Sequence, residues 1–61
     1  MLKELMKYIG AECTIYFIGS DVPFRCTIKK LEEQWMLVET ELGIKHLVNV
    51  QAIQSIAKGK A

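Results

Sequence analysis

The chain has 61 residues, a formal net charge of +1 and an apolar fraction of 51%. That length suits one small domain, which buries only about 60% of the surface that its unfolded chain exposes, so further stabilisation by self-association is expected. The balanced charge argues against a protein that binds polyanions through bulk positive charge, because such domains carry a marked basic excess.

The N-terminal residues predict a short amphipathic helix over residues 2–9. Apolar residues recur from Leu2 at i, i+3, i+4 and i+7, and charged residues occupy the other side of the helix. Gly10 follows at the place where many helices end in a left-handed conformation. A helix this short needs an apolar surface to dock on, so we expect it to cover one end of the core. The alternative is a membrane-surface or partner-binding helix.

The same segment does not have the pattern of a signal peptide. Charged residues interrupt its apolar residues, whereas a signal peptide has a continuous apolar core. No stretch of the chain approaches the ~20 apolar residues of a membrane span. We therefore expect a cytoplasmic protein without membrane contact, in which Cys13 and Cys26 stay reduced.

Five strands are expected after the helix, within residues 12–57. The first strand, over residues 12–17, alternates apolar and polar residues, and so does the second strand after Pro23. The alternation slips between Ile28 and Leu31. This slip predicts a bulge or a sharp bend in the second strand.

The third strand begins with Trp35-Met36-Leu37-Val38, which is apolar at every position. Such a run predicts a central strand that is buried on both faces, or one that faces another subunit. The fourth strand is expected over residues 44–48 and a short fifth strand over residues 53–57.

Residues 1–61 are expected to form a single domain with a frayed tail over residues 58–61, because no linker or repeat divides the chain. Cys13 and Cys26 should behave as small apolar residues of its core. His46 is expected to be a partly buried structural residue. The apolar phase of each element predicts five further members of one core: Leu5, Ile15, Ile28, Leu37 and Ile53.

The chain resembles the Sm-like family, whose members have a short helix and five strongly bent antiparallel strands and usually assemble into rings. Residues 26–32, Cys-Thr-Ile-Lys-Lys-Leu-Glu, are similar to Gly-x-Leu-x-x-Val-Asp of the first family segment, and residues 33–36 lie on its x-x-Met-Asn continuation. Residues 48–56 share the apolar skeleton of the second segment, Ile-Arg-Gly-x-x-Ile-x-x-Ile. The resemblance implies a mostly β domain closed into a small barrel. The alternative is another five-stranded small barrel.

The RNA-binding residues of the family are replaced in this chain. Family members that bind uridine-rich RNA hold the base with the Asn of the first segment and the Arg of the second, and stack it on a third side chain. Met36, Asn49 and Gln34 occupy these three places and are the RNA-contact candidates by family position. The bacterial RNA-chaperone branch carries Tyr-Lys-His where this chain has Asn49-Val50-Gln51. Neither pocket is intact, and a fold alone does not transfer function.

Positive and aromatic residues provide further candidates for RNA contact. Arg25, Lys29 and Lys30 could face phosphates, or they could form an ordinary solvated strand face. Trp35 could stack on a base, or it could anchor the core or an interface.

No catalytic site can be assembled from these residues, so the protein is not expected to be an enzyme. Catalysis needs a nucleophile with a base, paired carboxylates in a cleft or a metal site. Glu32 and Glu33 are adjacent at an expected turn, which is typical of solvated loop charges. Two distant cysteines and one histidine have no zinc-ligand spacing, so no metal or cofactor is expected.

Two functions remain open. The first is an Sm-like ring that binds single-stranded RNA, in which symmetry multiplies a weak contact. The alternative is a protein-interaction or assembly module that does not bind nucleic acid. We expect a homo-oligomer, a ring of five to seven subunits that joins the edges of the fourth and fifth strands, although the protein-interaction module could also be a dimer. The apolar contact would come from Leu47, Val48, Ile53 and Ile56. The alternative is a monomer whose helix or tail covers the strand edge.

Overall fold

One antiparallel sheet with a short helix makes up the fold of this chain. The computed structural model describes residues 2–59, without the side chain of Leu2. The strand order is β4-β3-β2-β1-β5. The elements are α1 (Leu2–Met6), β1 (Glu12–Phe17), β2 (Phe24–Leu31), β3 (Trp35–Glu39), β4 (Lys45–Asn49), the 3₁₀ turn η1 (Val50–Ala52) and β5 (Ile53–Lys58). The expected mostly β architecture with an N-terminal helix is confirmed.

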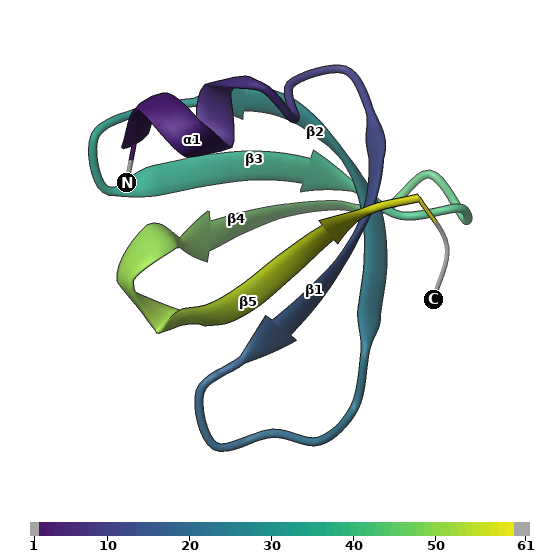
Figure 1. Cartoon of the computed structure of the whole chain (residues 1–61). Helices are drawn as coiled ribbons and strands as arrows, with labels where there is room; N and C mark the ends of the chain where they lie inside the picture. Colours follow the sequence, from purple (N-terminus) through teal and green to yellow (C-terminus); the bar gives the residue numbers. More distant parts are fainter. Residues whose placement is uncertain (1, 60–61) are drawn as a thin grey trace.

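The sheet is open, and the expected closure into a barrel is not observed. β4 and β5 lie at its two ends, and among residues 2–59 each pairs with one strand only, β4 with β3 and β5 with β1. Figure 1 shows how β2 curves from its place beside β3 towards its place beside β1. The curvature is strong, but the two end strands do not meet in register.

A bulge in β2 accounts for part of this curvature and confirms the predicted slip. Ile28 pairs with Val38, whereas the next pair joins Lys30 to Leu37, so β2 carries one additional residue. Such a bulge bends a strand and increases its twist. It also returns Leu31 to the face that carries Ile28, although the two positions have opposite parity in the sequence.

The helix ends earlier than predicted. α1 stops at Met6, and the chain continues through tighter turns in which the Tyr8 N–H donates to the Leu5 carbonyl at 2.9 Å. Ile9 then forms an isolated bridge with Ile28 instead of a last helical turn. Leu5 is buried in the core, but Met6 and Ile9 are exposed, so only part of the predicted apolar stripe docks.

The core lies on the concave face of the sheet beneath α1. Three of the five predicted members, Leu5, Ile15 and Ile28, are buried there, and Ile53 packs against them half-buried. Both cysteines are buried, as expected. The buried residues are Leu5, Cys13, Ile15, Cys26, Ile28, Met36, Val38 and Val50.

The prediction was wrong for Leu37 and for the two-sided burial of β3. Met36 and Val38 are fully buried, whereas Trp35 on the other face is 44% exposed and Leu37 is half-buried outside the core. Trp35 and Leu37 therefore keep contact with solvent on the outer face of β3. A run that is apolar at every position does not indicate which parity faces the core.

The last strand extends further than predicted. Lys58 belongs to β5, and Gly59 donates its N–H to the Glu12 carbonyl at 2.7 Å. Thr14, buried at 1% exposure, donates its hydroxyl to the Gly59 carbonyl at 2.9 Å. The prediction of a frayed tail was therefore wrong for residues 58 and 59. Residues 60 and 61 lie outside the described residues.

Candidate functional site

The three RNA-contact candidates named by family position do not form one site. Met36 is 0% exposed and pairs with Val48 on the inner face of the sheet. It is therefore a core residue and cannot contact a ligand at the surface. Gln34 and Asn49 are exposed and lie at one corner, where the Val50 N–H donates to the Gln34 carbonyl at 2.9 Å. The Asn49 side chain caps η1, with its Oδ1 accepting from the Gln51 N–H at 2.9 Å.

The candidate phosphate contacts are spread along β2. Arg25 pairs with Thr14 of β1, whereas Lys29 and Lys30 lie at the bulge opposite β3. All three are exposed. The Lys29 ammonium lies 3.5 Å from a Glu39 carboxylate oxygen, and that of Lys30 lies 3.6 Å from Glu32. The Lys30–Glu32 pair is exposed on both sides, and such surface pairs contribute about 0–1 kcal/mol, whereas Glu39 is half-buried beside Lys29.

The four proposed interface residues lie on the two end strands of the sheet. Leu47 of β4 projects from the outer face and is 64% exposed, whereas Val48 is half-buried on the inner face. Ile53 and Ile56 of β5 are half-buried against the core. Both ends of the sheet therefore carry apolar side chains next to backbone that pairs on one side only.

A groove lies between α1 and β5, and the sequence alone did not predict it. Its volume is about 390 Å³. The surrounding side chains are mainly apolar, from Leu5 and Tyr8 on the helical side and Ile53 and Ile56 on the strand. It is formed by segments almost fifty residues apart in the chain, so no local pattern indicates it.

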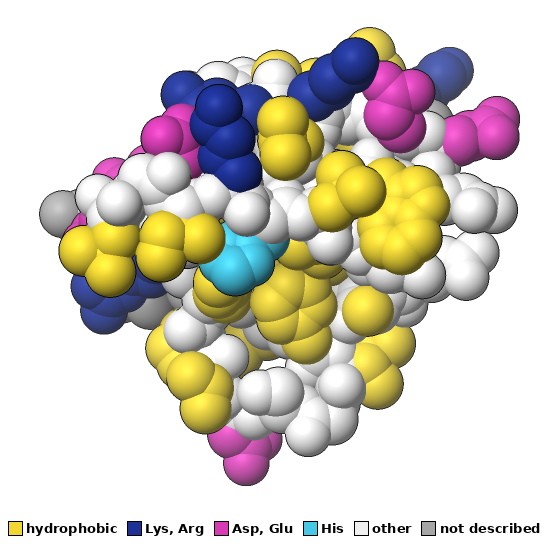
Figure 2. All heavy atoms as spheres, turned by 180° about the vertical axis from the view of Figure 1, so that it is seen from behind, with side chains coloured by type: hydrophobic (Ala, Val, Ile, Leu, Met, Phe, Trp, Pro, Cys, Tyr) yellow, Lys and Arg dark blue, Asp and Glu magenta, His cyan; other side chains and the backbone are white. Residues whose placement is uncertain are grey.

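A row of rings continues from the core to the surface at β4. The Phe24 ring lies 5.8 Å from that of Phe17 and 5.6 Å from that of His46, measured between ring centroids. His46 meets Phe24 edge-on at 83°. His46 is exposed, contrary to the expectation of partial burial, because β4 is an end strand. Figure 2 shows this cyan side chain at the surface, with hydrophobic side chains around it.

The two cysteines lie opposite each other on neighbouring central strands of the sheet. Cys13 lies opposite Cys26 in the register of β1 and β2, and both are free thiols. Burial raises the pKa of the Cys26 thiol to about 11, and the neighbouring Cys13 adds to this effect. Burial also raises the pKa of Cys13, against an opposing effect of Lys58. Thiols of this kind are poor nucleophiles at neutral pH.

Both thiols are expected to resist a disulfide reagent such as 5,5′-dithiobis(2-nitrobenzoate) in the folded protein at pH 8. The thiolate is the reactive form, and the raised pKa of both groups keeps it scarce until the pH approaches about 11 for Cys26. Denaturation in urea should release two rapidly reacting thiols per chain. Rapid reaction of either thiol in the native protein would contradict the burial described for these residues.

The described residues contain no cluster of three or more histidine, cysteine or carboxylate side chains placed to hold a metal ion. Within the same residues, no helix is long and apolar enough to cross a membrane. The fold and its surfaces define a small, open, antiparallel β domain with exposed end strands. Comparisons with protein-family models, with curated proteins and with solved structures found no match.

Proposed function

We propose that this domain is a cytoplasmic, non-catalytic assembly module of the Sm-like kind, which forms a homo-oligomeric ring of five to seven copies. In this ring, β4 of one copy pairs with β5 of the next. The observation that carries the proposal is the position of β4 and β5 at the two ends of an open sheet. The short helix and five curved strands agree with the family resemblance of the sequence.

Unpaired strand edges favour association unless a protein blocks them. Soluble proteins usually block an edge with charges, proline or a covering segment. The central part of β5, Ile53-Gln54-Ser55-Ile56, carries no charge, and the only proline, Pro23, lies outside both end strands. Two different edges that pair form a heterologous contact, which closes into a ring when the rotation per subunit permits it.

Apolar burial supports the same contact. A strand that joins β5 would lay its side chains against Ile53 and Ile56 and against the groove below α1. Leu47 and Val48 of the arriving β4 would supply apolar surface of their own. Such burial would add to a core of eight buried apolar residues among those described, and small domains commonly need a contribution of this kind.

Size-exclusion chromatography with light scattering tests the proposal at micromolar concentration. We expect a mass of five to seven times 7.0 kDa, between about 35 and 49 kDa. A mass near 7.0 kDa would refute the ring. A dimer would show self-association without the proposed closure.

RNA binding is a second candidate function, favoured by a specific observation. The family pocket does not support it, because Met36 is buried. The outer face of the sheet supports it, since Trp35 is 44% exposed there and Lys30 lies opposite Leu37 on the same face. The alternative without nucleic-acid binding is an assembly module whose surfaces contact only protein.

A further inference from the structure

The β1–β2 ladder joins the two halves of the open sheet. Among residues 2–59, β5 pairs only with β1, and β3 and β4 continue the sheet from β2. The ladder runs from Glu12 opposite Thr27 to Ile15 opposite Phe24. Cys13 opposite Cys26 is one of its pairs.

The register brings the two cysteines within the reach of a disulfide. Directly opposite residues of an antiparallel ladder project to the same face, and their Cα atoms lie about 4.5–5.5 Å apart. Disulfides span Cα distances of about 4.4–6.8 Å. The shared face is the inner one, because Cys13 is 0% and Cys26 is 2% exposed. The fold therefore already holds these two positions at a suitable separation.

We propose that Cys13 and Cys26 form a reversible intrachain disulfide, with a low-molecular-weight disulfide such as oxidised glutathione as the oxidant. One protein thiolate attacks the oxidant, forms a mixed disulfide and releases one glutathione thiolate. The other protein thiolate attacks the protein sulfur of this mixed disulfide, closes the Cys13–Cys26 bond and releases the second glutathione thiolate. Two protein thiols are thus oxidised, one glutathione disulfide is reduced, and the two protons pass to the released thiolates.

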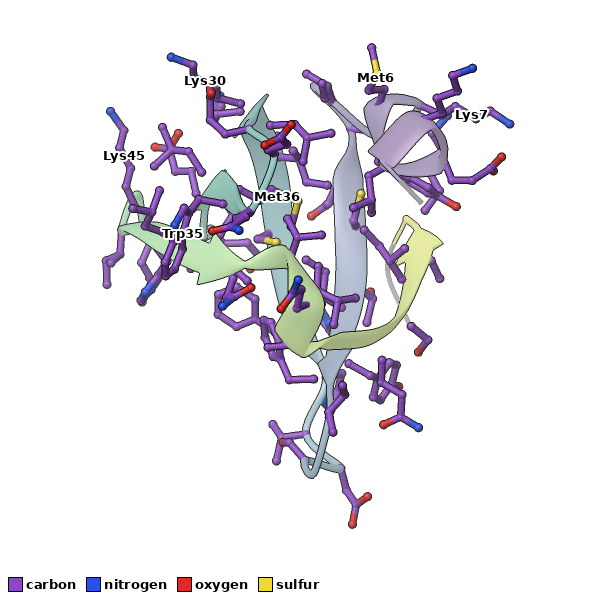
Figure 3. All side chains as sticks on the ribbon, turned by 90° about the vertical axis from the view of Figure 1, so that its left-hand side faces the viewer. Met6, Lys7, Lys30, Trp35, Met36 and Lys45 are labelled. Atoms are coloured by element: carbon purple, nitrogen blue, oxygen red, sulfur yellow. The ribbon has the colours of Figure 1, made fainter. Side chains whose placement is uncertain are left out.

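Burial makes this reaction slow and directs it to one product. Figure 3 shows the core, marked by Met36, between the helical segment that carries Met6 and the outer side that carries Trp35. The oxidant therefore reaches a cysteine only when the β1–β2 ladder opens locally. Since the chain has two cysteines, the second thiol that meets a mixed disulfide on closing is the opposite one.

The surroundings of the pair tolerate the bond. The Cys13 thiol donates to the Ala11 carbonyl at 3.4 Å, a weak hydrogen bond that the disulfide removes. The Ala11 carbonyl still accepts from the Ile28 N–H at 3.4 Å. The oxidised pair would link the two halves of the sheet covalently and constrain the unfolded chain, so oxidation should stabilise the fold. This effect depends on the register of one chain and not on the proposed ring.

Equilibration in glutathione buffers at pH 8 tests the inference. The full chain is brought to a constant composition from both the reduced and the oxidised side, once in native buffer and once in concentrated urea. It is then denatured and alkylated, and its intact mass distinguishes chains with two alkyl groups from disulfide-linked chains with none. The ratio of the two equilibrium constants reports whether the native structure favours the bond, because folding and oxidation form a thermodynamic cycle.

We expect disulfide formation to be at least about tenfold more favourable in native buffer than in urea, a modest value for a native disulfide. The oxidised protein should also unfold at a higher urea concentration, and dithiothreitol should reverse this shift. An equal or smaller equilibrium constant in native buffer would overturn the inference. Disulfide-linked dimers as the main product would overturn it as well.

Cys26→Ala/Thr27→Cys is the matched control. Thr27 follows Cys26 on β2 and pairs with Glu12, so the new thiol lies on the outer face, away from Cys13. In urea the variant should form its disulfide about as readily as the wild-type chain, because the closed loop differs by one residue. In native buffer the tenfold gain should be lost.

A gain as large as that of the wild-type protein in this folded variant would refute the role of the register. Circular dichroism shows beforehand whether the variant is folded. If it is not, the comparison of native buffer with urea for the wild-type chain still decides the inference, because that comparison needs no substitution.

Discussion

Replacement of Ile28 by alanine is expected to lower the free energy of unfolding by about 2–5 kcal/mol, the usual range for removing a large aliphatic side chain from a core. Ile28 is 0% exposed, pairs with Val38 and forms a bridge to Ile9. It therefore joins β2 both to β3 and to the segment after α1. A small domain at the lower end of the usual ~5–15 kcal/mol would come close to unfolding.

Urea denaturation followed by far-ultraviolet circular dichroism measures this effect, with all proteins at one concentration because association contributes to stability. Leu42→Ala is the control, since Leu42 is 86% exposed in the turn after β3 and should change stability by less than about 0.5 kcal/mol. If the Ile28→Ala variant unfolded at the same urea concentration as the wild-type protein, that result would contradict the position of Ile28 in the core.

Leu47→Lys is expected to convert the proposed ring into a monomer of 7.0 kDa. Leu47 is 64% exposed on an end strand, so the lysine should be tolerated within one chain. At a joint between two strands, the same lysine would replace an apolar contact with a charge, and edge lysines are a common device against strand pairing. Light scattering at several concentrations measures the change.

Val22→Lys provides the matched control, because Val22 is 70% exposed between β1 and β2, outside both end strands, and should leave the mass unchanged. Ile53→Lys tests the other side of the joint. Since Ile53 packs against the core, the circular dichroism spectrum of the Ile53→Lys variant must first show a folded domain. A folded Leu47→Lys or Ile53→Lys variant that keeps the wild-type oligomeric mass would contradict the proposed contact.

Local patterns determined much of the secondary structure of this chain. The alternation over residues 12–17 and after Pro23 predicted β1 and β2 correctly, because a half-buried strand requires a period of two. The slip between Ile28 and Leu31 also predicted the bulge, since both residues must reach the same core. Gly43 lies in the turn after β3 with a φ of +80°, a conformation that glycine adopts without steric cost.

Tertiary packing decided the features that lack a local signal. β3 is apolar at four successive positions, so only its partners determined that Met36 and Val38 face the core and that Trp35 faces outward. α1 ends at Met6, and Ile9 forms a bridge with Ile28 of β2, a long-range contact that no local pattern indicates. Periodicity predicts that an element exists, but it does not specify its neighbours.

The exposed surfaces depend most strongly on these long-range contacts. The groove between α1 and β5 and the grouping of Trp35 with Lys30 each combine residues from separate elements. The sequence alone predicted the types of residue that could bind a partner. Only the strand order, the bulge in β2 and the open ends of the sheet determined which of them share a face, because a strand presents its side chains alternately to two sides and its neighbours decide which side remains exposed.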